Sequence, residues 1–320
     1  MTRALLAIIA CLGSIVLLAL AAAMFGHSPV AVLQTLFEGS VGSRFAIEGT
    51  LLKTVPLLLT GLSVVIAFRA GAWNIGAEGQ FIVGAIAALI ASRYGNVAAM
   101  IAAIIAGALW ASIASVMRLW RNAPEVLTTI LLNFIAIHLL GWCVNGPLRE
   151  ASGQYPQSDP AAASLPGIGG VHAGVPLSIA IAIAMWWLLY RTEEGLRLRA
   201  TGFNAIAARY AGVNTNAQLV RAMAISGAIS GIAGAFELLG VTHRLFERFA
   251  AGYGYSGIAV ALLGQLHPLA NIAAAIFFAA LTSGAGELQR SAAISSAIAT
   301  FGQAVVILVI IAVSWRSKNA

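Results

Sequence analysis

Long apolar runs, separated by short polar stretches, follow one another along the whole chain. The runs are continuous, whereas the strands of a membrane β-barrel would show short segments of alternating polarity. Because a helix needs ~20 apolar residues to cross a bilayer, the runs predict about 10 transmembrane helices. They lie at residues 4–25, 50–68, 76–92, 97–117, 124–144, 175–190, 217–240, a short eighth piece that ends near 266, 269–285 and 298–315. We therefore expect an all-α polytopic membrane protein with a single transmembrane domain over 1–320.

Basic residues set the expected orientation. With the N-terminus in the cytoplasm, more of the 18 lysines and arginines fall on the inner side than on the outer side, as the positive-inside rule requires. Both termini are then cytoplasmic, 145–174 is an extracytoplasmic loop, and 191–216 lies in the cytoplasm. The first run is about 22 residues long, which exceeds the apolar region of a signal peptide. We expect it to be an uncleaved helix.

Composition excludes several classes of protein. The chain is 60% hydrophobic and 9% charged, with a mean hydropathy of +0.91, which excludes a soluble domain and a disordered chain. The net charge of +7 comes from scattered basic residues, so we expect no nucleic-acid partner. Cys11 and Cys143 lie in apolar runs without metal-ligand spacing. Phosphate-binding loops and catalytic motifs are missing from the sequence, so we expect no metal, no cofactor and no enzymatic activity.

The two halves of the chain have the same layout. In each, a glycine-containing span leads to a glycine-rich break, a short apolar piece and two further spans. The predicted topology makes spans 2–5 and 7–10 inverted repeats, with spans 1 and 6 outside them. Inverted repeats with paired, interrupted short segments indicate a transporter whose site lies near the middle of the membrane.

The first break, residues 69–80, is the most unusual stretch of the chain. Glu78 is an ionisable residue beside a membrane span, and such residues are candidates for function. We expect Asn74, Glu78 and Gln80 to lie at the pathway, with Trp73 as a stacking surface. The alternative is a solvated loop in which Glu78 caps the following helix.

The fifth span carries a polar stripe. At 100° per residue, Glu125, Thr129 and Asn133 fall on one side, and Asn133 is deep enough to face a cavity or a neighbouring helix. Glu125 follows Asn122 at capping-box spacing, so capping and energy coupling are equal alternatives for it. His138 lies nearly opposite the stripe, where we expect a hydrogen bond between helices rather than a ligand contact.

Two further segments carry expectations. In the seventh span, glycines at 227, 231 and 234 indicate close packing against another helix. In 191–216, a short helix over about 204–213 would expose Ala207 and Tyr210 beside Arg209. That helix is either a docking surface for another protein or a surface helix anchored at the lipid headgroups.

Four segments, in this order, resemble one family. They are T-G-L-S at 60–63 with F-R-A-G-A-W-N-I-G-A-E-G-Q-F at 68–81, E-V-L-T-T-I-L-L-N-F-I-A at 125–136, L-R-A-T-G-F-N-A-I-A-A-R-Y-A-G at 198–212, and G-I-A-V-A-L-L-G-Q-L-H-P at 257–268. The chain is similar to the permeases of bacterial nucleoside-type ABC importers, within the ribose and branched-chain amino acid permease family. One departure is the Ala72-Trp73 pair, which stands where a Leu-Phe-like pair is commoner.

The resemblance implies a heteromeric importer in the bacterial cytoplasmic (inner) membrane. Its expected partners are an ABC ATPase subunit, a second homologous permease chain and an extracytoplasmic substrate-binding protein. The expected substrate is a small polar solute: a nucleoside first, a simple sugar second. The alternative class is an ion-driven secondary transporter, for which Glu78 is the candidate carboxylate. The segment at 198–212 resembles the family's contact with the ATPase, which points to Gly202, Asn204, Ala207, Arg209, Tyr210 and Gly212 as coupling residues.

Overall fold

The computed structural model describes residues 13, 28–292 and 304. The spans expected at 4–25 and 298–315 lie outside these residues. The described elements are α2 (Pro29–Val41), α3 (Arg44–Arg69), α4 (Ala77–Ala91), η1 (Ser92–Tyr94), α5 (Asn96–Arg121), α6 (Glu125–Asn145), β1 (Gly167–Ile168), β2 (Val171–His172), α7 (Gly174–Arg191), α8 (Glu193–Phe203), α9 (Ala205–Tyr210), α10 (Thr215–Glu237), η2 (Leu238–Thr242), α11 (Tyr253–Leu263) and α12 (Pro268–Ala292).

Among the described residues, 6 helices are long and apolar enough to cross a membrane. They are α3, α5, α6, α7, α10 with its π-helical extension η2, and α12, and each overlaps a predicted span. α4 and α11 have only 15 and 11 residues, so neither reaches the ~20 that a crossing needs. The chain is thus an all-α membrane protein, while the total of about 10 spans stays a prediction.

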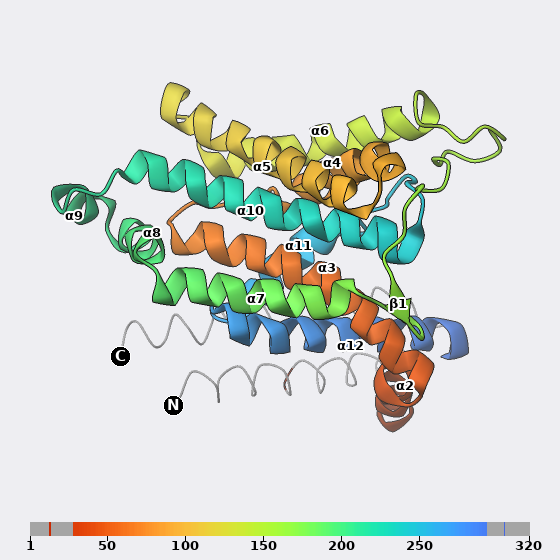
Figure 1. Ribbon diagram of the computed structural model, residues 1–320. Helices are drawn as coiled ribbons and strands as arrows, with labels where there is room; N and C mark the ends of the chain where they lie inside the picture. Colours follow the sequence, from red (N-terminus) through yellow and green to blue (C-terminus); the bar gives the residue numbers. More distant parts are fainter. Residues whose placement is uncertain (1–12, 14–27, 293–303, 305–320) are drawn as a thin grey trace.

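α3 and α10 form the centre of the bundle. α10 packs against α3, α4 and α5, and α3 packs against α11 and α12. In Figure 1, α5 and α6 lie on one side of α10, and α7 and α12 lie on the other. α8 and α9 lie at one end of the bundle, and the antiparallel hairpin of β1 and β2 lies towards the opposite end. The segments 145–174 and 191–216 are therefore well separated.

Helix α2 is an element that the sequence pattern did not predict. A proline in its first turn suits a helix start. Its apolar stripe is short: Val32 and Leu36 pack against Leu281 and Leu288 of α12. Two buried apolar residues in 13 give little periodic signal, and the contact with α12 supplies the stabilisation that the local sequence lacks.

Glycines bring α10 into backbone contact with its neighbours. A Cβ atom at Gly227 or Gly231 would clash with the backbone of α5, and one at Gly234 would clash with the carbonyl of Phe81 in α4. The prediction that these glycines are packing positions is confirmed. Such close approach matters in lipid, because van der Waals contact, rather than the hydrophobic effect, holds the helices together there.

The loop between α6 and α7 is fastened to the segment that follows α10. The backbone N–H of Ser158 donates to the carbonyl of Leu245 at 2.8 Å, and Arg244 forms an ion pair with Glu150 at 2.8 Å. A hydrogen bond from Gln157, assisted by Arg244, holds the pKa of the Glu150 carboxyl below its usual value. This end of the bundle is thus covered by ordered chain.

Candidate functional site

Two interruptions of helix meet in the interior of the bundle. Residues 70–76 join α3 to α4, and residues 243–252 join α10 to α11; we call them break one and break two. The short helices meet at their N-terminal ends, because a Cβ atom at Gly254 would clash with the backbone of Glu78. Break two turns through positive φ angles at three non-glycine residues, His243, Arg248 and Ala251. Such angles are uncommon outside glycine and mark a segment held by its surroundings.

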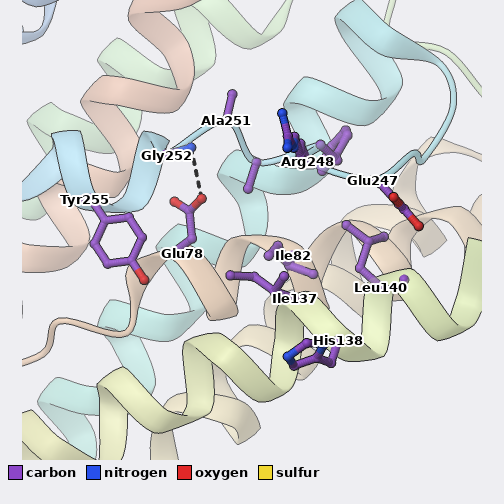
Figure 2. A pocket seen from close by; sticks show the side chains of 13 residues that line it. Glu78, Ile82, Ile137, His138, Leu140, Glu247, Arg248, Ala251, Gly252 and Tyr255 are labelled. Carbon is purple, nitrogen blue, oxygen red and sulfur yellow. Dashed lines mark hydrogen bonds between the residues drawn. The ribbon is translucent and has the colours of Figure 1, made fainter. Parts of the chain in front are cut away.

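Glu78 supplies the cap of α11. Its Oε1 accepts a hydrogen bond from the backbone N–H of Gly252 at 3.0 Å, and its Oε2 accepts one from Gly254 at 2.6 Å; Figure 2 shows the Gly252 bond. The side chain is 4% exposed. A carboxylate is stabilised at a helix N-terminus by the free N–H groups and the helix dipole. Glu78 thus caps a helix far along the chain. The expected alternative, a solvated loop in which Glu78 caps α4, is wrong because the side chain is buried and bonds to α11.

The polar stripe of α6 faces break one. Thr129 Oγ1 accepts from the N–H of Ile75 at 3.3 Å, and Asn133 Oδ1 accepts from the N–H of Gly79 at 2.8 Å. Asn133 Nδ2 also donates to the carbonyl of Ile75 at 2.9 Å. Side chains from a neighbouring helix thus satisfy the backbone groups that the break leaves open, as an apolar membrane requires.

Glu125 completes this stripe at the end near α8. It accepts a hydrogen bond from the backbone N–H of Trp73 at 3.4 Å and forms an ion pair with Arg118. The expectation that Glu125 and Asn122 form a capping box is wrong. Asn122 has a φ of 52° and ends α5 in the left-handed conformation, while Pro124 is the N-cap of α6 and makes no side-chain cap.

Asn74 and Gln80 bind each other across break one. Two hydrogen bonds of 3.0 Å join their amide groups, Asn74 Oδ1 accepts from the N–H of Gly76 at 2.8 Å, and Asn74 Nδ2 donates to Ser226 of α10 at 2.8 Å. Both amide side chains are almost completely buried. Fully bonded buried amides fix a unique local conformation, so these two residues hold the break in shape.

The long helices α3 and α10 each form a hydrogen bond with the short helix that follows the other one. The Thr60 hydroxyl of α3 shares its proton between the carbonyl of Pro56 at 2.7 Å and that of Tyr253, the first residue of α11, at 3.0 Å. Ser230 of α10 donates to the carbonyl of Ala77, the first residue of α4, at 2.6 Å. Each long helix therefore holds the start of the short helix that follows the other long helix.

A cavity of about 630 Å³ opens beside this junction, within the ~300–1,000 Å³ that is usual for small-molecule sites. Figure 2 shows its lining side chains, which come from α4, α6, break two and α11. The polar lining residues are Glu78, His138, Glu247, Arg248 and Tyr255.

The predicted pathway residues occupy different places. Glu78 lines the cavity, whereas Asn74, Gln80 and Asn133 are at most 1% exposed and hold the backbone. Trp73 is 57% exposed and packs against Phe68, with ring centroids 4.8 Å apart. Contact of these residues with a solute stays a prediction.

The sequence pattern missed the contribution of break two to the cavity. Its polar lining residues, Glu247 and Arg248, precede the short glycine-rich stretch around 252–257, and a position in a loop carries no periodic signal. Tyr255, in the first turn of α11, was visible within that stretch but had no motif around it.

α8 and α9 form the end of the bundle near break one. Gly202 of α8 lies directly on the backbone of Arg69 and Ala70, where a Cβ atom at Gly202 would clash. Glu194 anchors α8 to α10 through Gln218 at 3.0 Å and Arg221 at 2.9 Å. The hydrogen bond from Gln218, with help from the arginines, holds the pKa of Glu194 below its usual value.

α9 is shorter than expected and is presented outward. Asn204 Oδ1 accepts from the N–H groups of Ile206 and Ala207 at 3.0 Å each, so it is the N-cap of α9. Gly212, with a φ of +83°, ends this region. Ala207 and Arg209 are exposed. Three large side chains are exposed as well, at 84%, 72% and 91% for Phe203, Ile206 and Tyr210.

The profile of one family, described as branched-chain amino acid transport system, permease component, matches residues 46–314. The chain belongs to this permease family. It is 32% identical to the guanosine ABC transporter permease of Bacillus subtilis over 88% of this chain and 86% of that protein. It is 31% identical to the glucose ABC transporter permease of Haloferax volcanii over 88% and 80%, and 28% identical to the nucleoside ABC transporter permease of Lactococcus lactis over 86% and 80%.

The resemblance inferred from four sequence segments is thereby confirmed. The chain is an ABC-type permease of the nucleoside and sugar import family, and therefore a transport component rather than an enzyme. The glycine-rich and polar segments that carried the resemblance are those that build break one, the α6 stripe, the α8–α9 end and α11.

We expect Glu78→Ala to abolish transport by the permease and to lower its melting temperature, while the protein still inserts. The change leaves the N–H groups of Gly252 and Gly254 unpaired inside the bundle, at roughly 1–3 kcal/mol for each buried group. Glu78→Gln should fall between, because one amide oxygen still accepts. Thermal unfolding of the purified permease checks this, with the exposed Glu38→Ala as control. An unchanged melting temperature with normal transport would contradict the capping role.

Proposed function

We propose that the chain is the membrane-spanning subunit of an ATP-driven importer that translocates an uncharged polar solute, with nucleosides as the leading class. The names of the relatives support this, since guanosine and nucleoside permeases match over most of the chain. One observation supports an uncharged solute: a helix N-terminus is a ready site for an anion, yet here Glu78 occupies that of α11 and Asn133 bonds the first turn of α4.

Simple sugars are the second candidate, because a glucose permease is 31% identical to the chain. An ion-driven secondary transporter is the weaker alternative. Such a protein needs a carboxylate that binds and releases its cation. Glu78 accepts hydrogen bonds from backbone N–H groups of break two and α11 instead, and proton or cation binding there would disrupt the cap.

The importer would need three protein partners and a lipid membrane. An ATPase subunit would dock on α8 and α9, because exposed aromatic and apolar side chains at that end suit a protein contact. Two different guanosine permeases of Bacillus subtilis match this chain, at 32% and 27% identity, which supports pairing with a second homologous permease. A substrate-binding protein would deliver the solute on the extracytoplasmic side. The bacterial cytoplasmic membrane is the proposed location.

The reciprocal hydrogen bonds of Thr60 and Ser230 support the proposal of inverted repeats. The chain enters break one from the end of the bundle that carries α8, and it enters break two from the end that carries the loop 145–174. α4 and α11 therefore run in from opposite ends of the bundle. Two half-helices that meet at their N-terminal ends are the arrangement from which alternating access is built in transporters with inverted repeats.

Energy coupling would pass through Gly202. This residue packs on the backbone of Arg69 and Ala70 without an intervening side chain, so a displacement of α8 by the ATPase would press on the start of break one directly. From there, the Asn74–Gln80 pair and Glu78 connect break one to α10 and α11. Close-packed elements transmit such displacements because they move as units rather than deform.

Substrate competition tests the proposed solute. In cells that carry the complete transporter, we expect excess unlabelled adenosine or guanosine to suppress the uptake of radiolabelled guanosine. Guanosine monophosphate should not compete, because Glu78 and Asn133 already bond the N-terminal N–H groups of α11 and α4 beside the cavity. Glucose serves as the second comparison. Competition by glucose alone would assign the chain to sugar import, and competition by the nucleotide would refute the requirement for an uncharged solute.

Cysteine labelling tests the topology. With Cys11 and Cys143 replaced, a cysteine at Ile168, which is 93% exposed in the hairpin, should react with an impermeant maleimide in intact cells. A cysteine at Glu193, whose side chain is 75% exposed, should react only after the cells are opened. The basis is the excess of basic residues on the inner side. The reverse pattern would invert the proposed orientation.

Ala207→Glu tests the docking of the ATPase. The new carboxylate would be buried without a partner at the contact, and an unpaired buried charge costs several kcal/mol. We expect loss of ATPase co-purification and of uptake, with normal insertion. Ala151→Glu, an equally small exposed residue in the loop at the other end, is the matched control. Normal complex formation and uptake by Ala207→Glu would leave α9 as a surface helix at the lipid headgroups.

A further inference from the structure

Most polar side chains around the two breaks already form hydrogen bonds within the protein. Asn74, Gln80, Thr129 and Asn133 bond to backbone groups or to each other, and the Glu78 carboxylate is held by N–H groups. These groups have little capacity left for a passing solute. Any solute must therefore be met by other polar groups along the cavity.

His138 is the exception on α6. It has no hydrogen-bond or ion-pair partner among the described residues, and it is exposed near the middle of this 21-residue helix. It lines both the cavity beside Glu78 and the shallow apolar hollow on the outer face of α6. An imidazole at this depth is costly against hydrocarbon, so a polar or aqueous surrounding must face it.

The cavity offers such a surrounding. Across it, the Tyr255 hydroxyl accepts a hydrogen bond from Asn133 Nδ2 at 3.2 Å, which leaves its own proton to be donated. Glu247 and Arg248 of break two line the same cavity. Glu247 accepts from Asn145 at 2.9 Å, and the guanidinium group of Arg248 has no hydrogen-bond or ion-pair partner among the described residues. The cavity that His138 lines therefore also carries the polar groups of Tyr255, Glu247 and Arg248.

We propose that His138 is a solute-contacting residue of the translocation pathway, and that it and the Tyr255 hydroxyl bond the solute as it passes. A neutral imidazole has one donor and one acceptor nitrogen, and a phenol can do both as well. Such groups match the hydroxyl and amide groups of an uncharged solute. This inference rests on the proposed importer function, and it is an alternative to the expectation that His138 bonds a neighbouring helix.

Water accessibility tests the location of His138. In a chain with Cys11 and Cys143 replaced, His138→Cys should react with a charged methanethiosulfonate reagent in the assembled transporter, and excess guanosine should slow the reaction. Ile135→Cys is the matched control, since Ile135 is 54% exposed less than one turn away but does not line the cavity. Absence of reaction at 138, or an equal rate at 135, would overturn the proposal and assign this face to lipid or to the second permease.

Substitution tests the contact itself. We expect His138→Phe to reduce the maximal guanosine uptake at least tenfold, with normal membrane abundance and ATPase co-purification. His138→Gln, which keeps a donor and an acceptor, should retain most of the uptake, and Tyr255→Phe should lose part of it. Normal uptake by His138→Phe would refute the role of His138. The importer function would stand in that case if Ala207→Glu still abolished uptake.

Discussion

A helix that is interrupted inside a membrane leaves backbone N–H and C=O groups that no water can satisfy, and this constraint organises the whole bundle. Break one is satisfied by side chains from α6 and by its own Asn74–Gln80 pair, and α11 is capped by Glu78. Each break is thus completed by residues from elsewhere in the chain. α4 and α11 could not begin where they do without these partners.

The same constraint explains why glycine and hydrogen bonding occur together at this junction. Backbone groups of one short helix can be reached by a carboxylate of the other only if the two N-terminal ends approach closely, and Gly254 permits that approach. Gly202 permits a similar close approach of backbones between α8 and the end of α3. Direct backbone contacts therefore join α8 to the end of α3 and the start of break one at Gly202, and α4 to α11 at Gly254.

Much of this could be predicted from the sequence because it depends on local patterns. Apolar runs located the long helices, four-residue spacing predicted the packing glycines of α10, and the helical period of 100° placed Thr129 and Asn133 on one face. The partners of these groups could not be predicted. The bond between Glu78 and Gly252 joins residues 174 positions apart, and no pattern in either segment encodes it. α2 was missed because its stability comes from α12.

Some polar residues bond the backbone of the breaks, and others face the cavity. This division determines what the sequence can say about the substrate. The segments that carry the family resemblance, around 68–81 and 125–136, are the ones whose side chains complete the breaks. They report on how the backbone is held, and a transporter of guanosine and one of glucose need the same solution to that problem. The groups left facing the cavity, such as His138 and Arg248, belong to positions that no motif marks. On the proposal that His138 contacts the solute, information about the solute lies outside the segments by which the chain is recognised. That proposal agrees with the finding that relatives named for different solutes match the chain over nearly the same length.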